Sequence, residues 1–260
     1  MQKIGLCLSG GAARGVAHLG VLQALQELGV PIHAISGVSS GAIMGAFFAA
    51  GFSPPQILEL VNDLPLPRFF RPALNKGILH TQALHSIFEE HLKDRTFEEL
   101  PVKLIISALD LVEGSTVYFT KGSLVDALKA SSAVPVLFKP SQQGKRLLVD
   151  GGIVNNLPVE CLTGECDSII GVHVNPTLYH ADINSIRQVT ERIFHLALHA
   201  NVLARVSYCT ILLEPPQLVN FHIYDLKRAM EMYVIGYEYT MELAAELKAL
   251  ASAGKTTGAI

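Results

Sequence analysis

The chain has 260 residues, of which 50% are hydrophobic and 17% charged, and its formal net charge is −3. This length is enough for one large α/β domain with a sizeable core. The small negative charge and the lack of any run of Lys and Arg exclude the basic surface that nucleic-acid binding needs. The longest apolar stretch, Ala42 to Phe52, is far short of the ~20 residues of a membrane-spanning helix.

The four cysteines, Cys7, Cys161, Cys166 and Cys209, do not have the spacing of a disulfide framework. We therefore expect a reducing, cytoplasmic compartment, and we see no signal-peptide pattern at the first residues. Cys161 and Cys166 have no second pair that could complete a zinc site, so buried thiols are expected. No metal and no cofactor is predicted.

The first elements form a strand, a glycine loop, a helix and a second strand. Residues 3 to 9 are predicted to be a strand, which runs into the loop Gly10-Gly11-Ala12-Ala13-Arg14-Gly15. A helix follows from about Val16 to Leu28, and Ile32 to Ile35 begins the next strand. This βαβ unit predicts a parallel sheet with the loop at the carboxyl end of the first strand, where ligands bind in such sheets.

The glycine loop matches neither of two common nucleotide motifs. A dinucleotide fingerprint needs glycine where Ala12 stands, and a Walker loop needs a lysine where Gly15 stands. The remaining functional interpretation is an oxyanion hole built from consecutive backbone N–H groups. Arg14 would then add a positive charge near the same edge of the sheet. A loop that only lets helix and sheet approach closely remains an alternative.

Gly37-Val38-Ser39-Ser40-Gly41 lies between an apolar strand and a helix of small residues, Ala42 to Ala50. That order is the context of a nucleophile elbow, in which the residues two before and two after the nucleophile must be very small. Gly37 and Gly41 satisfy this rule for Ser39, whereas Ser40 would have Val38 and Ala42 at those places. Ser39 is therefore the candidate nucleophile. A turn that merely joins strand to helix is the alternative.

Residues 63 to 80 are rich in proline and carry Phe69-Phe70 between Arg68 and Arg71. We expect a long loop or partial lid. Basic residues beside exposed aromatic rings suit an anionic bilayer, so peripheral membrane contact is predicted here. The alternative, in which both rings pack on the core, stays open.

The remaining elements alternate between helices and strands, without an internal repeat or a break in composition. The helices are expected over Gln56–Asn62, Thr81–Leu92, Leu124–Ser132, Ile186–Tyr208 and Tyr224–Leu250, and the strands over Val102–Asp110, Thr116–Thr120, Arg146–Val149, Ile169–Val174 and Thr210–Glu214, with a polar turn over Ser141–Lys145. We predict one domain over residues 1–260, with a motif-bearing part over about 3–174 and a helical part over about 186–251.

Asp150 follows an apolar strand and precedes Gly151 and Gly152, which leaves its carboxylate uncrowded. A serine nucleophile needs a base, and Asp150 is placed as such a residue would be. The alternative is an aspartate that bonds only its own turn. Asn155 and Asn156 would pin the loop through backbone hydrogen bonds.

Five histidines follow Asp150 and were considered for a Ser-His-Asp triad: His173, His180, His195, His199 and His222. His173 lies within a predicted strand, where a core role is expected. His195 and His199 are four residues apart in a predicted helix, with no loop around them that would favour catalysis. No histidine stands out.

Four blocks resemble bacterial patatin-like phospholipases, in matching order from about Lys3 to Val174. They are LSGGAARGVAHLGVLQAL, SGVSSGAIMGAFFAAG, KASSAVPVLFKP and LLVDGGIVNNLPV. The resemblance implies an α/β fold with a mostly parallel sheet flanked by helices. It also implies a Ser-Asp dyad that hydrolyses lipid acyl esters without a histidine, with the nucleophile at Ser39 and the aspartate at Asp150.

The same resemblance places the oxyanion hole at Gly10, Gly11 and Ala12, supported by Ala13, Arg14 and Gly15. The departure from the family pattern is Ala12, where glycine is commonest. We predict a phospholipase or lysophospholipase that acts through an acyl-enzyme, with a pH profile that lacks a limb near 6.5. The alternatives are an esterase or thioesterase for soluble acyl substrates, and a non-catalytic lipid-binding regulatory protein.

Overall fold

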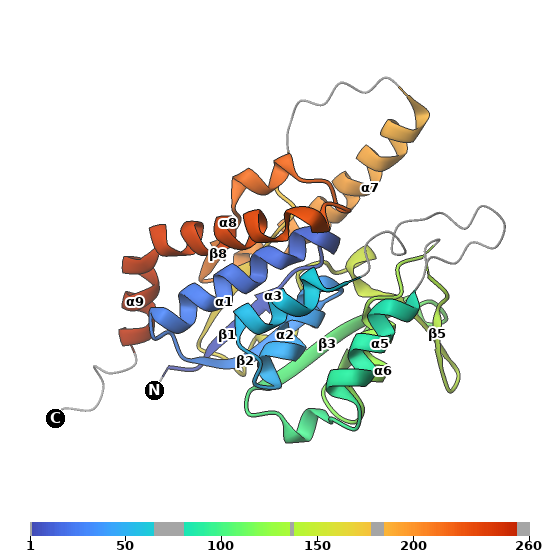
Figure 1. The fold of residues 1–260 in the computed structure, drawn as a ribbon, viewed down its shortest axis with the longest axis horizontal. Coiled ribbons are helices and arrows are strands. Elements are labelled where there is room, and N and C mark those ends of the chain that lie inside the picture. Colours follow the sequence, from blue (N-terminus) through green and yellow to red (C-terminus); the bar gives the residue numbers. More distant parts are fainter. Residues whose placement is uncertain (1, 65–80, 136–137, 178–184, 254–260) are drawn as a thin grey trace.

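The computed structural model describes residues 2–64, 81–135, 138–177 and 185–253 (Figure 1). Its core is one eight-stranded sheet in the order β5-β6-β3-β2-β1-β7-β8, with β4 paired to β3. The strands are β1 (Ile4–Leu8), β2 (Ile32–Val38), β3 (Lys103–Asp110), β4 (Ser115–Phe119), β5 (Ser141–Gln143), β6 (Arg146–Asp150), β7 (Ser168–Val172) and β8 (Ile211–Leu213). The helices are α1 (Ala17–Glu27), α2 (Ser40–Ala49), α3 (Pro54–Asn62), α5 (Thr81–Leu92), α6 (Leu124–Ser131), α7 (Ile186–Leu203), α8 (Ala229–Glu242) and α9 (Ala244–Ser252).

The sheet is mixed but mostly parallel, which confirms the predicted fold class. Strand β1 pairs in parallel with β2 and β7, β2 pairs in parallel with β3, and β8 extends the parallel part at the edge. Strands β4, β5 and β6 run antiparallel to their neighbours. The parallel strands end at one edge of the sheet, so the residues that follow β1 and β2 lie close together there.

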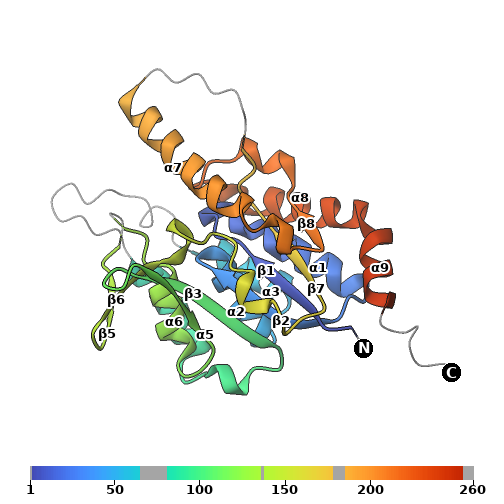
Figure 2. The same cartoon turned by 180° about the vertical axis from the view of Figure 1, so that it is seen from behind.

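Successive residues of the strands face two different cores, because side chains alternate across a pleated strand. In β1, Leu6 and Leu8 belong to a large core on the helix-covered face, and Cys7 belongs to a smaller core on the opposite face. Figure 1 shows α1, α2 and α3 in front of the strands, and Figure 2 shows the strands from behind. Helix α2 is buried because it lies between the sheet and the other helices of this layer.

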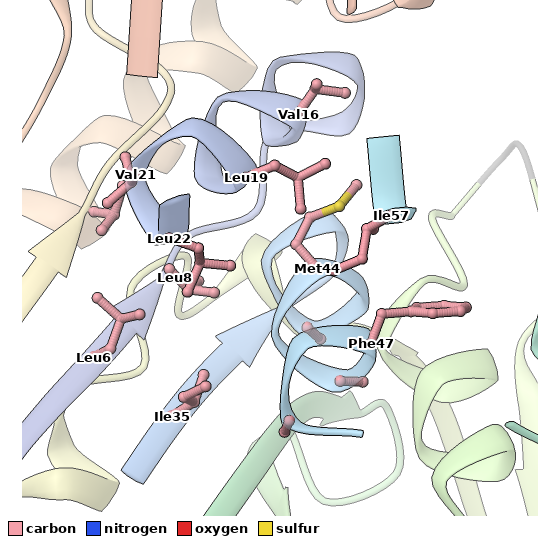
Figure 3. Packing of buried hydrophobic residues seen from close by; sticks show 14 of the residues in the cluster. Leu6, Leu8, Val16, Leu19, Val21, Leu22, Ile35, Met44, Phe47 and Ile57 are labelled. Atoms are coloured by element: carbon pink, nitrogen blue, oxygen red, sulfur yellow. The ribbon is translucent and has the colours of Figure 1, made fainter. Parts of the chain in front are cut away.

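The close view in Figure 3 shows how these layers meet. Leu19 and Leu22 from α1 lie between β1 and α2. From α2, Met44 points toward α3 and Phe47 points toward α5. All four side chains are at most 5% exposed. Truncating a buried leucine of this kind to alanine typically costs about 2–5 kcal/mol, so this layer holds α2 firmly against the sheet.

The C-terminal helices pack on the first helix. A Cβ atom on Gly20 of α1 would overlap the carbonyl oxygen of Tyr233 in α8, and one on Gly236 of α8 would overlap that of Ala17 in α1. The two backbones therefore approach at mutual glycine contacts, which neither helix could make with a larger residue. The segment that carries no motif is in this way joined to the βαβ unit.

The structure differs from the predictions in several local features. The predicted turn Ser141–Lys145 contains strand β5, which forms a hairpin with β6 around Gly144, whose φ is 60°. Helix α7 ends at Leu203 and is followed by a separate turn of 3-10 helix, and the last predicted helix is divided into α8 and α9. The predicted lid covers residues 63–80, and all of it beyond residue 64, including the phenylalanine pair, lies outside the described residues. Within the described chain, no helix is both long enough and apolar enough to cross a bilayer.

Candidate active site

Ser39 lies at the sharp turn between β2 and α2, in a strained backbone conformation. Its φ is 53° and its ψ is −124°, values that non-glycine residues rarely adopt and that cost energy unless the surroundings enforce them. A Cβ atom on Gly37 would lie 2.8 Å from the amide nitrogen of Ala42, and one on Gly41 would overlap the carbonyl oxygen of Leu8. The glycines on either side of Ser39 are thus required by the crowded backbone of the turn.

The two neighbouring serines have different environments. Ser39 is partly exposed, whereas Ser40 is 6% exposed. The hydroxyl of Ser40 is buried without a hydrogen-bond partner in the described part of the chain, and it packs so closely on Gly15 that a side chain there would overlap it. Only Ser39 therefore presents its hydroxyl to an open space.

Asp150, the last residue of β6, lies close to that hydroxyl. The backbone N–H of Gly152 donates to Asp150 Oδ1 at 2.8 Å. Burial raises the pKa of the Asp150 carboxyl to about 6, although the nearby Ser39 hydroxyl and the bond from Gly152 act in the opposite direction. A carboxyl with this pKa is ionised at neutral pH and has a higher proton affinity than an ordinary aspartate.

The register of β3 explains why Ser39 and Asp150 meet. Val38 of β2 pairs with Ser107, and Asp150 of β6 pairs with the next residue, Ala108. Strand β4 pairs with residues 106–110 of β3 and so occupies one edge of β3 there. Both β2 and β6 pair with parts of the same range, so they lie one after the other along the opposite edge of β3. The two strands run toward each other along this edge, and their ends meet.

Behind Ser39, the loop Gly10–Gly15 presents backbone amides that have no partner. The N–H groups of Gly10, Gly11 and Ala12 donate no hydrogen bond within the described residues. Ala12 has a φ of 49°, in the left-handed region where glycine is favoured, so the loop keeps the glycine-like shape at this departure from the family pattern. Ser39 and Ala12 line the same cavity.

The next two residues of this loop hold it in place. The N–H of Ala13 donates to the carbonyl of Ile223 at 3.0 Å, and Arg14 Nε donates to the carbonyl of Phe221 at 2.8 Å. Arg14 is 8% exposed, and burial lowers its pKa. Its guanidinium thus supports the loop from behind, in contact with the C-terminal segment, which the sequence did not reveal.

An apolar cavity of about 160 Å³ opens beside Ser39. Its walls come mainly from α2, α3 and α5 and include Ile43, Met44, Phe47, Leu60, Ile87 and Phe88. For comparison, an apolar protein cavity of ~150 Å³ can hold benzene. A hydroxyl close to a carboxylate, amides without an acceptor in the described residues and apolar space are together the parts that transfer of a hydrophobic acyl group requires.

The described histidines have other partners. His173 Nδ1 lies 2.6 Å from Glu214 Oε1, and the rings of His173 and His199 are 6.3 Å apart. His18 Nε2 lies 2.8 Å from the carbonyl oxygen of Ser9, and burial lowers the pKa of His18 to about 4. His222 is exposed. None of these four hydrogen-bonds Ser39 or Asp150.

His180 and the side chain of His195 lie outside the described residues. Within the described part of the chain, no group of three or more His, Cys, Asp and Glu side chains is arranged to hold a metal ion. The cysteines are free, and burial raises the pKa of each thiol.

Three side chains that the sequence analysis did not assign to the site contact its backbone. Ser131 Oγ accepts a hydrogen bond from the N–H of Ser39 at 2.8 Å. Asn156 and Asn175 both donate to the carbonyl of Gly10, at 3.3 and 2.6 Å. Ser131 and Asn156 lie within the blocks quoted above, and that was the available signal. Asn175 follows β7 and lies outside those blocks, so no signal in the sequence pointed to it.

Comparisons with known proteins bear on the family of the chain. The model of the family described as patatin-like phospholipase matches residues 6–162. An uncharacterized NTE family protein of Mycobacterium tuberculosis is 35% identical over 173 residues, 64% of this chain and 29% of the relative. Lysophospholipase NTE1 of Candida glabrata is 27% identical over 290 residues, 98% of this chain and 16% of the relative. The chain thus spans less than a third of either protein.

Among solved structures, VipD from Legionella pneumophila superposes with a TM-score of 0.52 at 18% identity, covering 94% of this chain and 67% of that one. This similarity supports the fold. The family match covers more than half of the chain, including Ser39 and Asp150. The chain belongs to the patatin-like phospholipase family.

Proposed function

We propose that the chain is a serine lipid acyl hydrolase of the phospholipase A or lysophospholipase type, in which Ser39 and Asp150 form the catalytic dyad. The closeness of the Ser39 hydroxyl and the Asp150 carboxyl, beside an apolar cavity, is the observation that carries the proposal. We further propose that residues 1–260 form one domain and that the enzyme contacts a lipid surface peripherally.

In the first half of the reaction, Ser39 Oγ attacks the carbonyl carbon of the ester while its proton passes to Asp150. The N–H groups of Gly11 and Ala12 stabilise the negative charge that develops on the carbonyl oxygen. When the intermediate collapses, the bond to the alcohol oxygen breaks and Asp150 returns the proton to that oxygen. The acyl group is then attached to Ser39, with its chain in the cavity.

In the second half, Asp150 takes a proton from water as the water oxygen attacks the acyl-enzyme. The same amides stabilise the second oxyanion. Collapse releases the fatty acid, and the proton on Asp150 returns to Ser39 Oγ. The raised pKa of Asp150 supports this role because a general base works best when its pKa lies near the working pH.

The test is covalent labelling by a fluorophosphonate probe together with hydrolysis of phospholipid and lysophospholipid in mixed micelles. We expect one label, located on Ser39, and release of fatty acid that Ser39→Ala abolishes. Ser40→Ala is the matched control, because it removes a neighbouring hydroxyl that is buried and has no hydrogen-bond partner within the described residues. A wild-type protein that binds these lipids but is neither labelled nor active would instead be a non-catalytic lipid-binding protein. If the protein hydrolysed only water-soluble esters or thioesters, these would be its substrate class instead of lipids.

A further inference from the structure

Two asparagine side chains meet at one peptide group of the glycine loop. Asn175 Nδ2 donates to the carbonyl oxygen of Gly10 at 2.6 Å, and Asn156 Nδ2 donates to the same oxygen at 3.3 Å. The carbonyl of Gly10 and the N–H of Gly11 belong to one peptide unit, and this unit is trans, because the described chain contains no cis peptide bond. In a planar trans peptide the C=O and N–H bonds point in opposite directions.

It follows that bonds to the Gly10 carbonyl determine where the Gly11 N–H points. This N–H has no acceptor within the described residues, so without the two asparagines little would prevent the peptide from rotating. A flipped peptide would direct a carbonyl oxygen toward the developing oxyanion and repel it. Donation to the carbonyl also polarises the peptide and strengthens its N–H as a donor.

Asn156 is itself held on several sides. It is 3% exposed, and its backbone N–H donates to Asn201 Oδ1 at 2.9 Å. Its side-chain oxygen would lie 2.6 Å from a Cβ atom on Gly10 and equally close to one on Gly152. Asn156 therefore fills the space between the glycine loop and the turn after Asp150, and glycine is needed on both sides of it.

The turn that Asn156 contacts is the one that orients the carboxylate, since the Gly152 N–H bonds Asp150. Asn201, on α7, also donates to the carbonyl of Gly152 at 3.3 Å. One set of amide side chains thus links the Gly10–Gly11 peptide, the turn after Asp150 and helix α7.

We propose that Asn175 and Asn156 are positioning residues that orient the Gly10–Gly11 peptide, so that the Gly11 N–H is aimed at the oxyanion before substrate binds. The inference rests on the proposed function, because it concerns the stabilisation of the same intermediate. It adds two residues that touch neither the ester nor the serine and act through the glycine loop.

The test is the separate measurement of kcat and KM for a short-chain ester in Asn175→Ala, Asn156→Ala and the double variant. Removing one oxyanion donor from an enzyme costs about 10²–10³-fold in kcat. Since the two amides share one acceptor, we expect Asn175→Ala to lose about tenfold in kcat, Asn156→Ala less, and the double variant about 10²-fold. KM should change less than about twofold, because the ground-state ester is held mainly by the apolar cavity.

Asn155→Ala is the matched control. Asn155 is as buried as its neighbour, but its amide donates to Glu160 and Tyr118, away from the glycine loop. We expect it to keep kcat within about twofold of the wild type. If Asn155→Ala lost as much kcat as the double variant, the effect would be general loosening of the turn and the proposal would be wrong.

Labelling with the fluorophosphonate probe separates this inference from the proposed function. An active, labelled wild type with an unchanged double variant overturns the inference alone. A wild type that is neither active nor labelled overturns the proposed function, and the inference with it. Should loss of the buried Asn156 prevent folding, Asn175→Ala decides the matter, because Asn175 is only half-buried and is expected to give the larger single effect.

Discussion

Two pairs of polar side chains lie at the end of the sheet where the parallel strands finish, and they differ in what surrounds them. Ser39 and Asp150 follow β2 and end β6, while His173 and Glu214 follow β7 and β8. The His173–Glu214 contact, at 2.6 Å, has the residue types most often used as acid and base. Yet neither of its residues lines the apolar cavity, which Ser39 does.

The electrostatic environments of the two carboxylates also differ. The hydrogen bond from His173 lowers the pKa of Glu214, so that its charge is stabilised by a fixed partner. Burial raises the pKa of Asp150, so its carboxylate binds a proton more readily than that of an ordinary aspartate. Ser39 and Asp150 are the candidate reactive pair because they adjoin a cavity and include a carboxyl with a raised pKa. The types of residue alone would have favoured the other pair.

The largest expected effect comes from Ser39→Ala, which removes the proposed nucleophile. We expect activity to fall by at least about 10³-fold, while circular dichroism and the melting temperature stay close to wild type. Ser40→Ala should retain activity, because its hydroxyl is packed against Gly15. If Ser40→Ala were inactive and Ser39→Ala active, the assignment of the elbow would be wrong.

The second test replaces Asp150 and, one at a time, the five histidines that follow it in the chain. Asp150→Asn should lose about 10²–10⁴-fold in kcat/KM, the usual contribution of a positioned base. Glutamine at His173, His180, His195, His199 or His222 should cost far less. A histidine variant that stays folded but falls as far as Asp150→Asn would replace the dyad by a triad.

The third test is the pH dependence. The ionised carboxylate is the active form, so kcat/KM should rise with pH through a midpoint of about 6. At one pH unit below the midpoint, activity should be about tenfold below its plateau. The sequence predicted no histidine-like limb near pH 6.5, whereas the raised pKa of Asp150 predicts a limb near pH 6 that belongs to the carboxylate. The limb should persist in His173→Gln and disappear in Asp150→Asn, and the reverse result would assign it to the histidine.

The fourth test concerns the cavity that only the first pair adjoins. Each methylene buried there should contribute about 0.8 kcal/mol, so kcat/KM should rise about fourfold per added carbon until the space is filled. Leu60→Trp should reduce kcat/KM for an octanoyl ester by about tenfold and leave a butyryl ester nearly unchanged. Leu111→Trp, on the exposed turn after β3, is the control. An unaltered chain-length profile in Leu60→Trp would place the acyl chain elsewhere.

The smallest expected effect is on stability, and its sign is opposite for the two carboxylates. Because the folded-state pKa of Asp150 is raised, its ionisation destabilises the fold above pH 6 and has no effect below its unfolded pKa. Asp150→Asn should therefore increase the free energy of unfolding at pH 8 by about 3 kcal/mol, with no gain at pH 3. Glu214→Gln should decrease it at pH 8, because the lowered pKa of Glu214 stabilises the fold until the pH falls through that pKa. Urea denaturation at the two pH values measures both.

The sequence alone determined the features that depend on close neighbours in the chain. The strand, glycine pair and helix around Ser39 could be predicted because the crowding of an elbow falls two residues to either side. The βαβ unit and most helices and strands followed from the periodicity of apolar residues, which directly reflects burial on one or two faces. Ala12 was recognised as a departure, but only its φ of 49° shows that the loop keeps its shape there.

The tertiary structure decided how distant segments meet. Asp150 ends an antiparallel strand and reaches Ser39 only because β6 pairs with the part of β3 that extends beyond β2. In the same way, Arg14 supports its loop by bonding Phe221, and Asn175 reaches the carbonyl of Gly10 across the end of β7. Such contacts are set by register and packing between elements far apart in the chain, which a local pattern of residues does not encode.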